Sequence, residues 1–249
     1  MRHWRPVALT ATALLALGGL GYAAAQTVAA PREIDLGLDT TQQQVAAPSP
    51  AQQTAPAQPA APTGPPRVDE SWVAANAAKA GIPTAALRAY ANAQLSEPTA
   101  CEVGWTTLAG IGWIESQHGT VGDRTLGDDG HSSTPILGPA LDGDPFAAIR
   151  ATRATTAWHG DRDWDHAVGP MQFIPSTWEQ WGTDGDGDGT ADPNDIDDAA
   201  ATAVAYLCAD GHDLTSGAGW ADAIFGYNHD DSYVASVHAA ASEYAERTT

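Results

Sequence analysis

The chain has 249 residues, of which 43% are hydrophobic, so it is long enough to bury a substantial core in one folded domain. Its 31 acidic residues outnumber its 11 lysines and arginines, and the formal net charge at pH 7 is −20. This charge argues against nucleic acid and anionic membrane surfaces as partners, because both are themselves negatively charged.

Residues 1–26 have the features of a secretory signal peptide. Arg2 and Arg5 precede an apolar run over residues 7–20, and small residues at 23–25 precede Gln26. The apolar stretch is close to the ~20 residues that span a bilayer, so a retained N-terminal membrane anchor is the alternative. Both interpretations predict an exported protein that acts outside the cytoplasm, in the cell wall or tethered to the membrane.

Residues 27–67 are predicted to be a disordered linker. This stretch is rich in Ala, Pro, Gln and Thr and has too few large apolar residues to form a core. Aromatic and aliphatic residues return at Trp72, so the folded domain is expected over residues 68–249. We expect this domain to be a monomer.

The folded domain is predicted to be all-α or α-dominated. Helical signals, with Pro or Gly at several of the ends, predict helices over residues 71–80, 83–94, 101–116, 175–181, 196–209, 220–227 and 233–246. Residues 119–165 are rich in Gly, Asp, Ser and Pro and are predicted to form long loops. No segment alternates with a period of two, which argues against a large sheet.

The two cysteines of the chain, Cys101 and Cys208, are predicted to form a disulfide. In an exported protein, two cysteines far apart in the sequence are most simply a disulfide pair. Closing so long a loop would stabilise the fold by ~4 kcal/mol. Two lone cysteines are too few for a thiolate metal site.

The sequence GTDGDGDGTADPND, residues 182–195, matches the spacing of an EF-hand calcium loop. Oxygen-bearing side chains recur at loop places 1, 3, 5, 7, 9 and 12, and Gly189 stands at place 6, where the chain turns sharply. The predicted ligands of a structural Ca²⁺ are Asp184, Asp186, Asp188, Thr190 and Asp195.

Place 12 of such a loop normally carries a bidentate Glu. The shorter Asp195 predicts a weaker site, recruitment of Asp197 or Asp198, or tolerance of Mg²⁺. A solvated turn of Asp and Gly without metal is the alternative. The eight histidines are scattered, which argues against zinc, and no second EF-hand is visible, which argues against a calcium sensor. We therefore expect a metal that braces the fold, and no organic cofactor.

Glu115 is the candidate catalytic residue. It stands in GIGWIESQHG, near the end of a predicted helix whose face is otherwise apolar and small. A poorly solvated carboxyl should have its pKa raised from ~4.3 toward ~6, the range that suits a general acid. Taken alone, a capping or salt-bridging Glu is the simpler interpretation.

Glu115 and Ser116 open an ordered set of motifs. They are followed by VGPMQFIPSTW, the DGDGDG loop, YLCADG and AIFGYNHDDSYV. In this order the motifs resemble the lytic murein transglycosylases, specifically the membrane-bound lytic transglycosylase B type, over residues 82–244. The resemblance implies an α+β lysozyme-like version of the helical fold, with residues 68–249 as the catalytic domain.

The resemblance also implies the roles of individual residues. Glu115 would be the single catalytic acid and base, and Ser116 would help to orient it. Glycan contacts are implied for Met171, Gln172, Phe173, Tyr227 and Asn228. Such enzymes cleave the β-1,4 bond between N-acetylmuramic acid (MurNAc) and N-acetylglucosamine (GlcNAc) in peptidoglycan, forming a 1,6-anhydro ring without consuming water.

The chain departs from the family pattern at one segment. An Asp-Arg pair is common before the Ala-Val-Gly-Pro stretch, whereas this chain has Asp165-His166, and ATRATTAWHGDRDW replaces an upstream Asp-rich motif. This difference affects the glycan contacts expected of that loop, whereas the catalytic core motifs are intact.

Two alternatives stay open. One is a non-catalytic, calcium-braced peptidoglycan-binding module. The other is a muramidase that hydrolyses the same bond with a second carboxylate, chosen from Asp123, Asp128, Asp129, Asp142, Asp144, Asp161, Asp163 and Asp165.

Overall fold

The computed structural model describes residues 66–96, 101–143, 147–209 and 211–249. The predicted signal peptide or anchor, and nearly all of the predicted linker, lie outside these residues. None of the helices in the described part is long and apolar enough to cross a membrane.

The described residues form eight helices and a small two-stranded sheet, which confirms the α-dominated fold class and is consistent with a lysozyme-like domain. In chain order the elements are α1 (Glu70–Ala80), α2 (Thr84–Ser96), α3 (Trp105–Ser116), β1 (Leu137–Ala140), α4 (Arg153–His159), β2 (His166–Val168), α5 (Pro175–Trp181), α6 (Ile196–Cys208), α7 (Gly217–Tyr227) and α8 (Asp231–Thr248).

Local capping residues account for many of the helix ends. Asp69 accepts hydrogen bonds from the backbone N–H groups of Ser71 and Trp72 and so begins α1. Gly81 ends the same helix in the left-handed conformation, at φ 73°. Pro175 occupies the first turn of α5, where its missing N–H leaves no intrahelical bond unmade.

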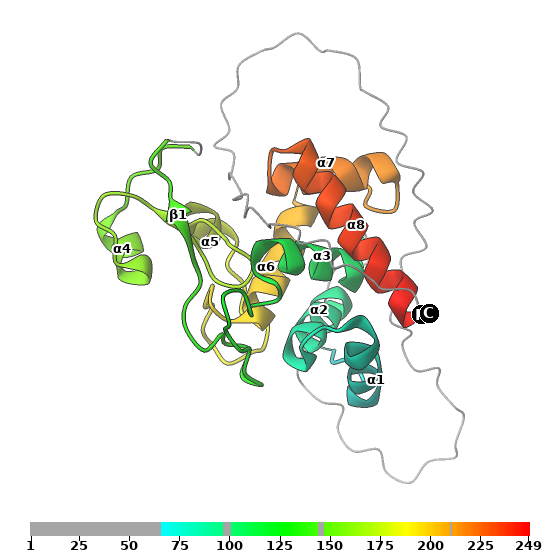
Figure 1. The fold of residues 1–249 in the computed structure, drawn as a ribbon. Helices are drawn as coiled ribbons and strands as arrows, with labels where there is room; N and C mark the ends of the chain where they lie inside the picture. The colour runs from blue at the N-terminus through cyan, green and yellow to red at the C-terminus, as the bar shows by residue number, and fades with distance from the viewer. Residues whose placement is uncertain (1–65, 97–100, 144–146, 210) are drawn as a thin grey trace, which may run out of the picture.

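Helix α3 forms the centre of the domain (Figure 1). It packs mainly against α8 and also against α2, while α2 packs along α6. Nearly all of α3 is buried, including Trp105, Leu108 and Ile111. Gly110 permits the close approach of α8, because a Cβ at this position would lie 2.8 Å from the carbonyl oxygen of Val237. The helix that carries Glu115 is therefore held tightly on several sides.

The prediction that residues 119–165 form only loops is wrong. This segment contains α4 and strand β1, which pairs antiparallel with β2. Helix α4 has a capping box between Thr152 and Thr155 and ends at Gly160. Only Thr155 of this helix is buried, so its sequence lacks the apolar periodicity that reveals longer helices. Figure 1 shows α4 and β1 at one side of the helical body.

The predicted disulfide is present. Cys101 and Cys208 are bonded across a sequence separation of 107 residues. The bond joins the segment that precedes α3 to the last residue of α6. It therefore links the N-terminal side of the helix that carries Glu115 to the helix that follows the acidic loop.

Candidate active site and acidic loop

Glu115 lies in the last turn of α3 and is buried, with 5% of its surface exposed. Its Oε1 atom accepts a hydrogen bond of 2.6 Å from the hydroxyl of Tyr233, which is on α8. Burial raises the pKa of Glu115 from 4.5 to about 8, and the Tyr233 hydrogen bond acts in the opposite direction. The predicted direction is confirmed, and the carboxyl is neutral over most of the physiological pH range.

Two tyrosines, Tyr233 and Tyr227, lie near this carboxyl. Tyr227, the last residue of α7, lies parallel to Tyr233 with 6.5 Å between ring centroids. Burial raises the pKa of Tyr227, and the nearby charge of Glu115 raises it further. The Tyr227 hydroxyl donates to the backbone carbonyl of Met171 at 2.9 Å, and its ring contacts Phe173 edge to face. Motifs that are far apart in the sequence thus meet at Glu115.

The other predicted site residues are buried as well. Ser116 donates to the carbonyl of Pro170 at 2.5 Å and accepts from the N–H of Gly119, so its hydroxyl fixes backbone rather than contacting the Glu115 carboxyl. Gln172 donates to the carbonyl of Gly169 at 2.8 Å and adopts a positive φ of 52°. Asn228 follows α7 in extended conformation with 4% exposure.

None of the five predicted glycan-contacting residues at 171–173, 227 and 228 is more than 4% exposed. Two of them, Met171 and Phe173, contact Tyr227. Their contact with glycan stays a prediction.

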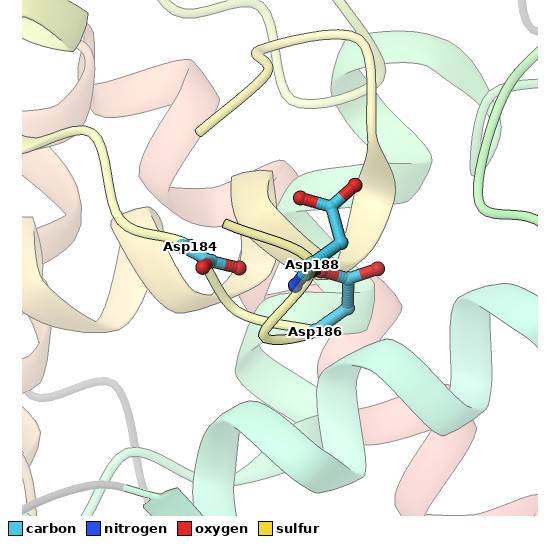
Figure 2. A group of neighbouring side chains, drawn as sticks. All are labelled: Asp184, Asp186 and Asp188. Atoms are coloured by element: carbon cyan, nitrogen blue, oxygen red, sulfur yellow. Dashed lines mark hydrogen bonds between the residues drawn. The ribbon is translucent and has the colours of Figure 1, made fainter. Parts of the chain in front are cut away.

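The acidic loop between α5 and α6 gathers three of the predicted metal ligands. The carboxylates of Asp184, Asp186 and Asp188 each place an oxygen within 4.8 Å of the others, and Figure 2 shows them on the same turn of the chain. Asp184 accepts from the N–H groups of Gly187 and Gly189, which shapes the turn. The cluster is partly open to solvent.

Asp195 does not join this cluster. Its Oδ1 accepts from the N–H of Asp197 and begins α6, and its Oδ2 lies 3.6 Å from the imidazole of His131. Asp198 instead ties the loop together, since its two oxygens accept from the N–H groups of Gly185 and Asp192. Burial and the nearby charge of Asp186 together raise the pKa of Asp197 to about 6, so Asp197 is close to the cluster.

The donor set fits a hard divalent cation. Each of the three carboxylates places an oxygen within 4.8 Å of the others, and hard cations bind oxygens of this kind. The Thr190 backbone carbonyl follows at the spacing of place 7.

Residues 148–224 match the model of a family described as a transglycosylase SLT domain. The match supports the resemblance to lytic transglycosylases, and it indicates a transglycosylase-type enzyme whose substrate is peptidoglycan. No curated protein matches the chain at a significant level.

The region that matches the transglycosylase SLT domain runs from the segment before α4 to near the end of α7. It includes the Met171–Phe173 segment and the acidic loop. It does not include Glu115, Tyr227 or Tyr233, whose assignment therefore depends on the geometry described above.

Within this region, the segment that departs from the family pattern is internally bonded. Asp165 is buried and accepts from the Thr155 hydroxyl at 2.6 Å and from Nε2 of His159 at 3.1 Å. Asp161 pairs with His166 at 3.2 Å, and hydrogen bonds from the Asp163 N–H and from His166 lower its pKa to about 2. These two carboxylates therefore have local structural partners.

Tyr233 and His118 are two further residues near Glu115 that sequence patterns alone do not identify. Tyr233 lies within the motif AIFGYNHDDSYV, but only the fold shows that it returns to Glu115. His118 follows Glu115 by three residues and is buried between the hydroxyls of Tyr90 and Tyr244. The place of His118 three residues after Glu115 was the available signal in the sequence.

Proposed function

We propose that the chain is a lytic transglycosylase of the membrane-bound B type, which cleaves the β-1,4 MurNAc-GlcNAc bond and forms 1,6-anhydroMurNAc. The observation that carries this proposal is a single buried carboxyl, Glu115, that stays protonated to a pH of about 8. A neutral carboxyl at pH 7 is what a general acid requires. The match to the transglycosylase SLT domain supports the reaction class.

The geometry favours one oxygen of Glu115 as the proton donor. Because Tyr233 donates to Oε1, the proton of the neutral carboxyl belongs on Oε2. In the first step Oε2 gives this proton to the leaving glycosidic oxygen while the bond to C1 of MurNAc breaks. The acetamido group of the substrate stabilises the positive charge that develops on the sugar.

The same carboxyl then acts as the base. The carboxylate of Glu115 takes the proton from the 6-hydroxyl of MurNAc, and the oxygen of that hydroxyl attacks C1 to close the anhydro ring. Glu115 returns to its neutral form, and no water is consumed. The Tyr233 hydrogen bond strengthens when Glu115 is ionised, which stabilises the carboxylate between the two steps.

The environment of Glu115 argues against the muramidase alternative. Hydrolysis would require a second carboxylate about 5–10 Å away. Burial raises the pKa of Glu115, and the hydrogen bond from Tyr233 lowers it. Asp161 and Asp165 already have partners, while Asp144 lies outside the described residues.

We further propose that Asp184, Asp186 and Asp188, with Thr190 and Asp197, hold a structural Ca²⁺ that braces the domain. When bound, the cation would neutralise the cluster and fix the loop that leads into α6. We also propose that the protein is exported, monomeric and tethered by or released from its N-terminal segment, because residues 1–26 have the pattern of an export signal.

Mass spectrometry of digested peptidoglycan tests the proposal. Wild-type protein should release muropeptides with 1,6-anhydro ends, and Glu115→Gln should release none. Glu179→Gln, at an exposed position on α5, is the matched control and should keep full activity. Reducing ends would establish the muramidase alternative, and equal cell-wall binding without turnover by all three proteins would establish the binding module.

A further inference from the structure

A buried hydrogen-bonded chain lies behind the end of α3. His118 is 1% exposed and lies between two phenols: its Nδ1 is 3.1 Å from the hydroxyl of Tyr90, and its Nε2 is 2.8 Å from the hydroxyl of Tyr244. Tyr90 is on α2 and Tyr244 is on α8. The imidazole therefore connects three helices at the point where α3 ends.

We infer that His118 is a positioning residue for Glu115. Through Tyr90 and Tyr244 it fixes the end of α3 against α2 and α8, and it thereby holds the Glu115 carboxyl at hydrogen-bonding distance from Tyr233. This inference rests on the proposed role of Glu115 as the acid of the reaction.

The backbone around His118 supports this role. Gln117, His118 and Gly119 have consecutive positive φ angles of 54°, 60° and 82°. Residues other than glycine rarely adopt this conformation, and they keep it only where the surroundings fix it. The His118 N–H donates to the carbonyl of Gly112 at 2.8 Å, which folds the residue back along α3.

Gly112 shows that α3 is shaped around this chain of hydrogen bonds. A Cβ at residue 112 would lie 2.0 Å from the Tyr90 hydroxyl, so a side chain at that position would expel the phenol from its place beside His118. Helix α3 thus has a glycine at the position where the Tyr90 hydroxyl of α2 lies against it.

The chemistry of the three groups requires a neutral imidazole. A neutral histidine has one nitrogen that donates and one that accepts, and each phenol can complement either. Burial lowers the pKa of His118 to about 3 and raises the pKa of Tyr244 above its ordinary value, so both remain uncharged where the protein functions. The bonds therefore act as a constant support rather than as a switch.

Helix α8 contacts α3 at both ends of this arrangement. Tyr233 in its first turn donates to Glu115, and Tyr244 in its last turns contacts His118. If the second contact is lost, α8 is free to tilt on α3, and the bond between Tyr233 and Glu115 lengthens. A misplacement of ~1 Å at a catalytic group lowers the rate by ~10²-fold.

Three variants test the inference. Tyr244→Phe removes one hydrogen bond, His118→Leu removes both, and His118→Gln keeps an amide that can donate and accept. We expect kcat to fall by ~10-fold or more in the first two, with KM within about twofold of wild type. His118→Gln should recover part of the lost kcat.

The pKa of Glu115, measured by ¹³C NMR without substrate, gives a second readout. The Tyr233 hydrogen bond lowers this pKa. Loss of the support should therefore raise it in Tyr244→Phe and move the alkaline limb of the kcat profile to higher pH. Because this measurement needs no turnover, it tests the positioning role even if the protein does not form anhydro products.

Val73→Ala is the control for a general loss of stability. Val73 is fully buried in a separate small cluster with Val68 and Ala91. The Val73→Ala variant should have a lower melting temperature than wild type, while its kcat and the pKa of its Glu115 stay unchanged. Unchanged kcat and pKa in folded Tyr244→Phe would overturn the inference. Failure of both Tyr244→Phe and His118→Gln to fold would also overturn it, since His118 would then be a general requirement of the fold.

Discussion

The burial of Glu115 has a measurable cost in stability at alkaline pH. The folded pKa of about 8 lies above the ordinary value of 4.5, so the folded state holds a proton that the unfolded state releases. The contribution of this proton to the free energy of unfolding is therefore fully present below pH 4.5, and it is lost as the pH rises toward 8. The difference of 3.5 in pKa corresponds to roughly 5 kcal/mol at about 1.36 kcal/mol per unit, of which about 3–4 kcal/mol falls between pH 5 and pH 8.

Glu115→Gln removes this titration and keeps an acceptor for Tyr233. We compare the free energy of unfolding of the variant with that of wild type at each pH. This difference should favour the variant by about 3–4 kcal/mol more at pH 8 than at pH 5. Urea denaturation of both proteins at pH 5, 6, 7 and 8 measures the difference, and other titrating groups cancel in it. Glu179→Gln, at an exposed position on α5, is the control for the same change of residue type outside the core. A flat difference for Glu115→Gln would mean that the carboxyl is solvated and would refute the buried-acid argument.

Three further outcomes are expected. Tyr233→Phe removes a hydrogen bond that lowers the pKa of Glu115, and a hydrogen bond to a charged group contributes ~1.5–3 kcal/mol. The alkaline limb of the kcat profile should therefore move to higher pH by about 1–2 pH units. An unmoved limb would contradict the contact with Glu115. Replacing Cys101 and Cys208 with serine should lower the free energy of unfolding by about 4–5 kcal/mol in denaturant titrations, and a loss below ~1 kcal/mol would show that the bond constrains little. Chelation should lower the melting temperature and Ca²⁺ should restore it, whereas Asp186→Asn should abolish the response; melting curves indifferent to both would remove the metal site.

The stability cost and the proposed activity have the same origin. A solvated Glu115 would be ionised at pH 7 and unable to donate a proton, while a buried one is neutral and destabilises the fold as the pH rises. The disulfide joins the segment before α3 to the end of α6 and so offsets part of the destabilising effect of an acid held out of water. A metal bound at the acidic loop, as proposed, would offset more of it.

The sequence by itself determined the features that depend on local chemistry. The ends of α1 and α5 follow from Asp69, Gly81 and Pro175, whose effects on the backbone act over a few residues. The apolar neighbours of Glu115 in α3 likewise indicated a raised pKa, because residues of one helix face share its surroundings. Short-range patterns of this kind can be read without the fold.

The tertiary structure alone decided which distant groups meet. Tyr233 reaches Glu115 across 118 residues, and Tyr244 reaches His118 across 126 residues, through the packing of α8 on α3. Asp195 matches the metal loop in spacing, yet it begins α6 and faces His131 instead. Sequence spacing fixes which residues are near along the chain, whereas the direction of a side chain depends on how whole helices pack, and that is set by the complete core.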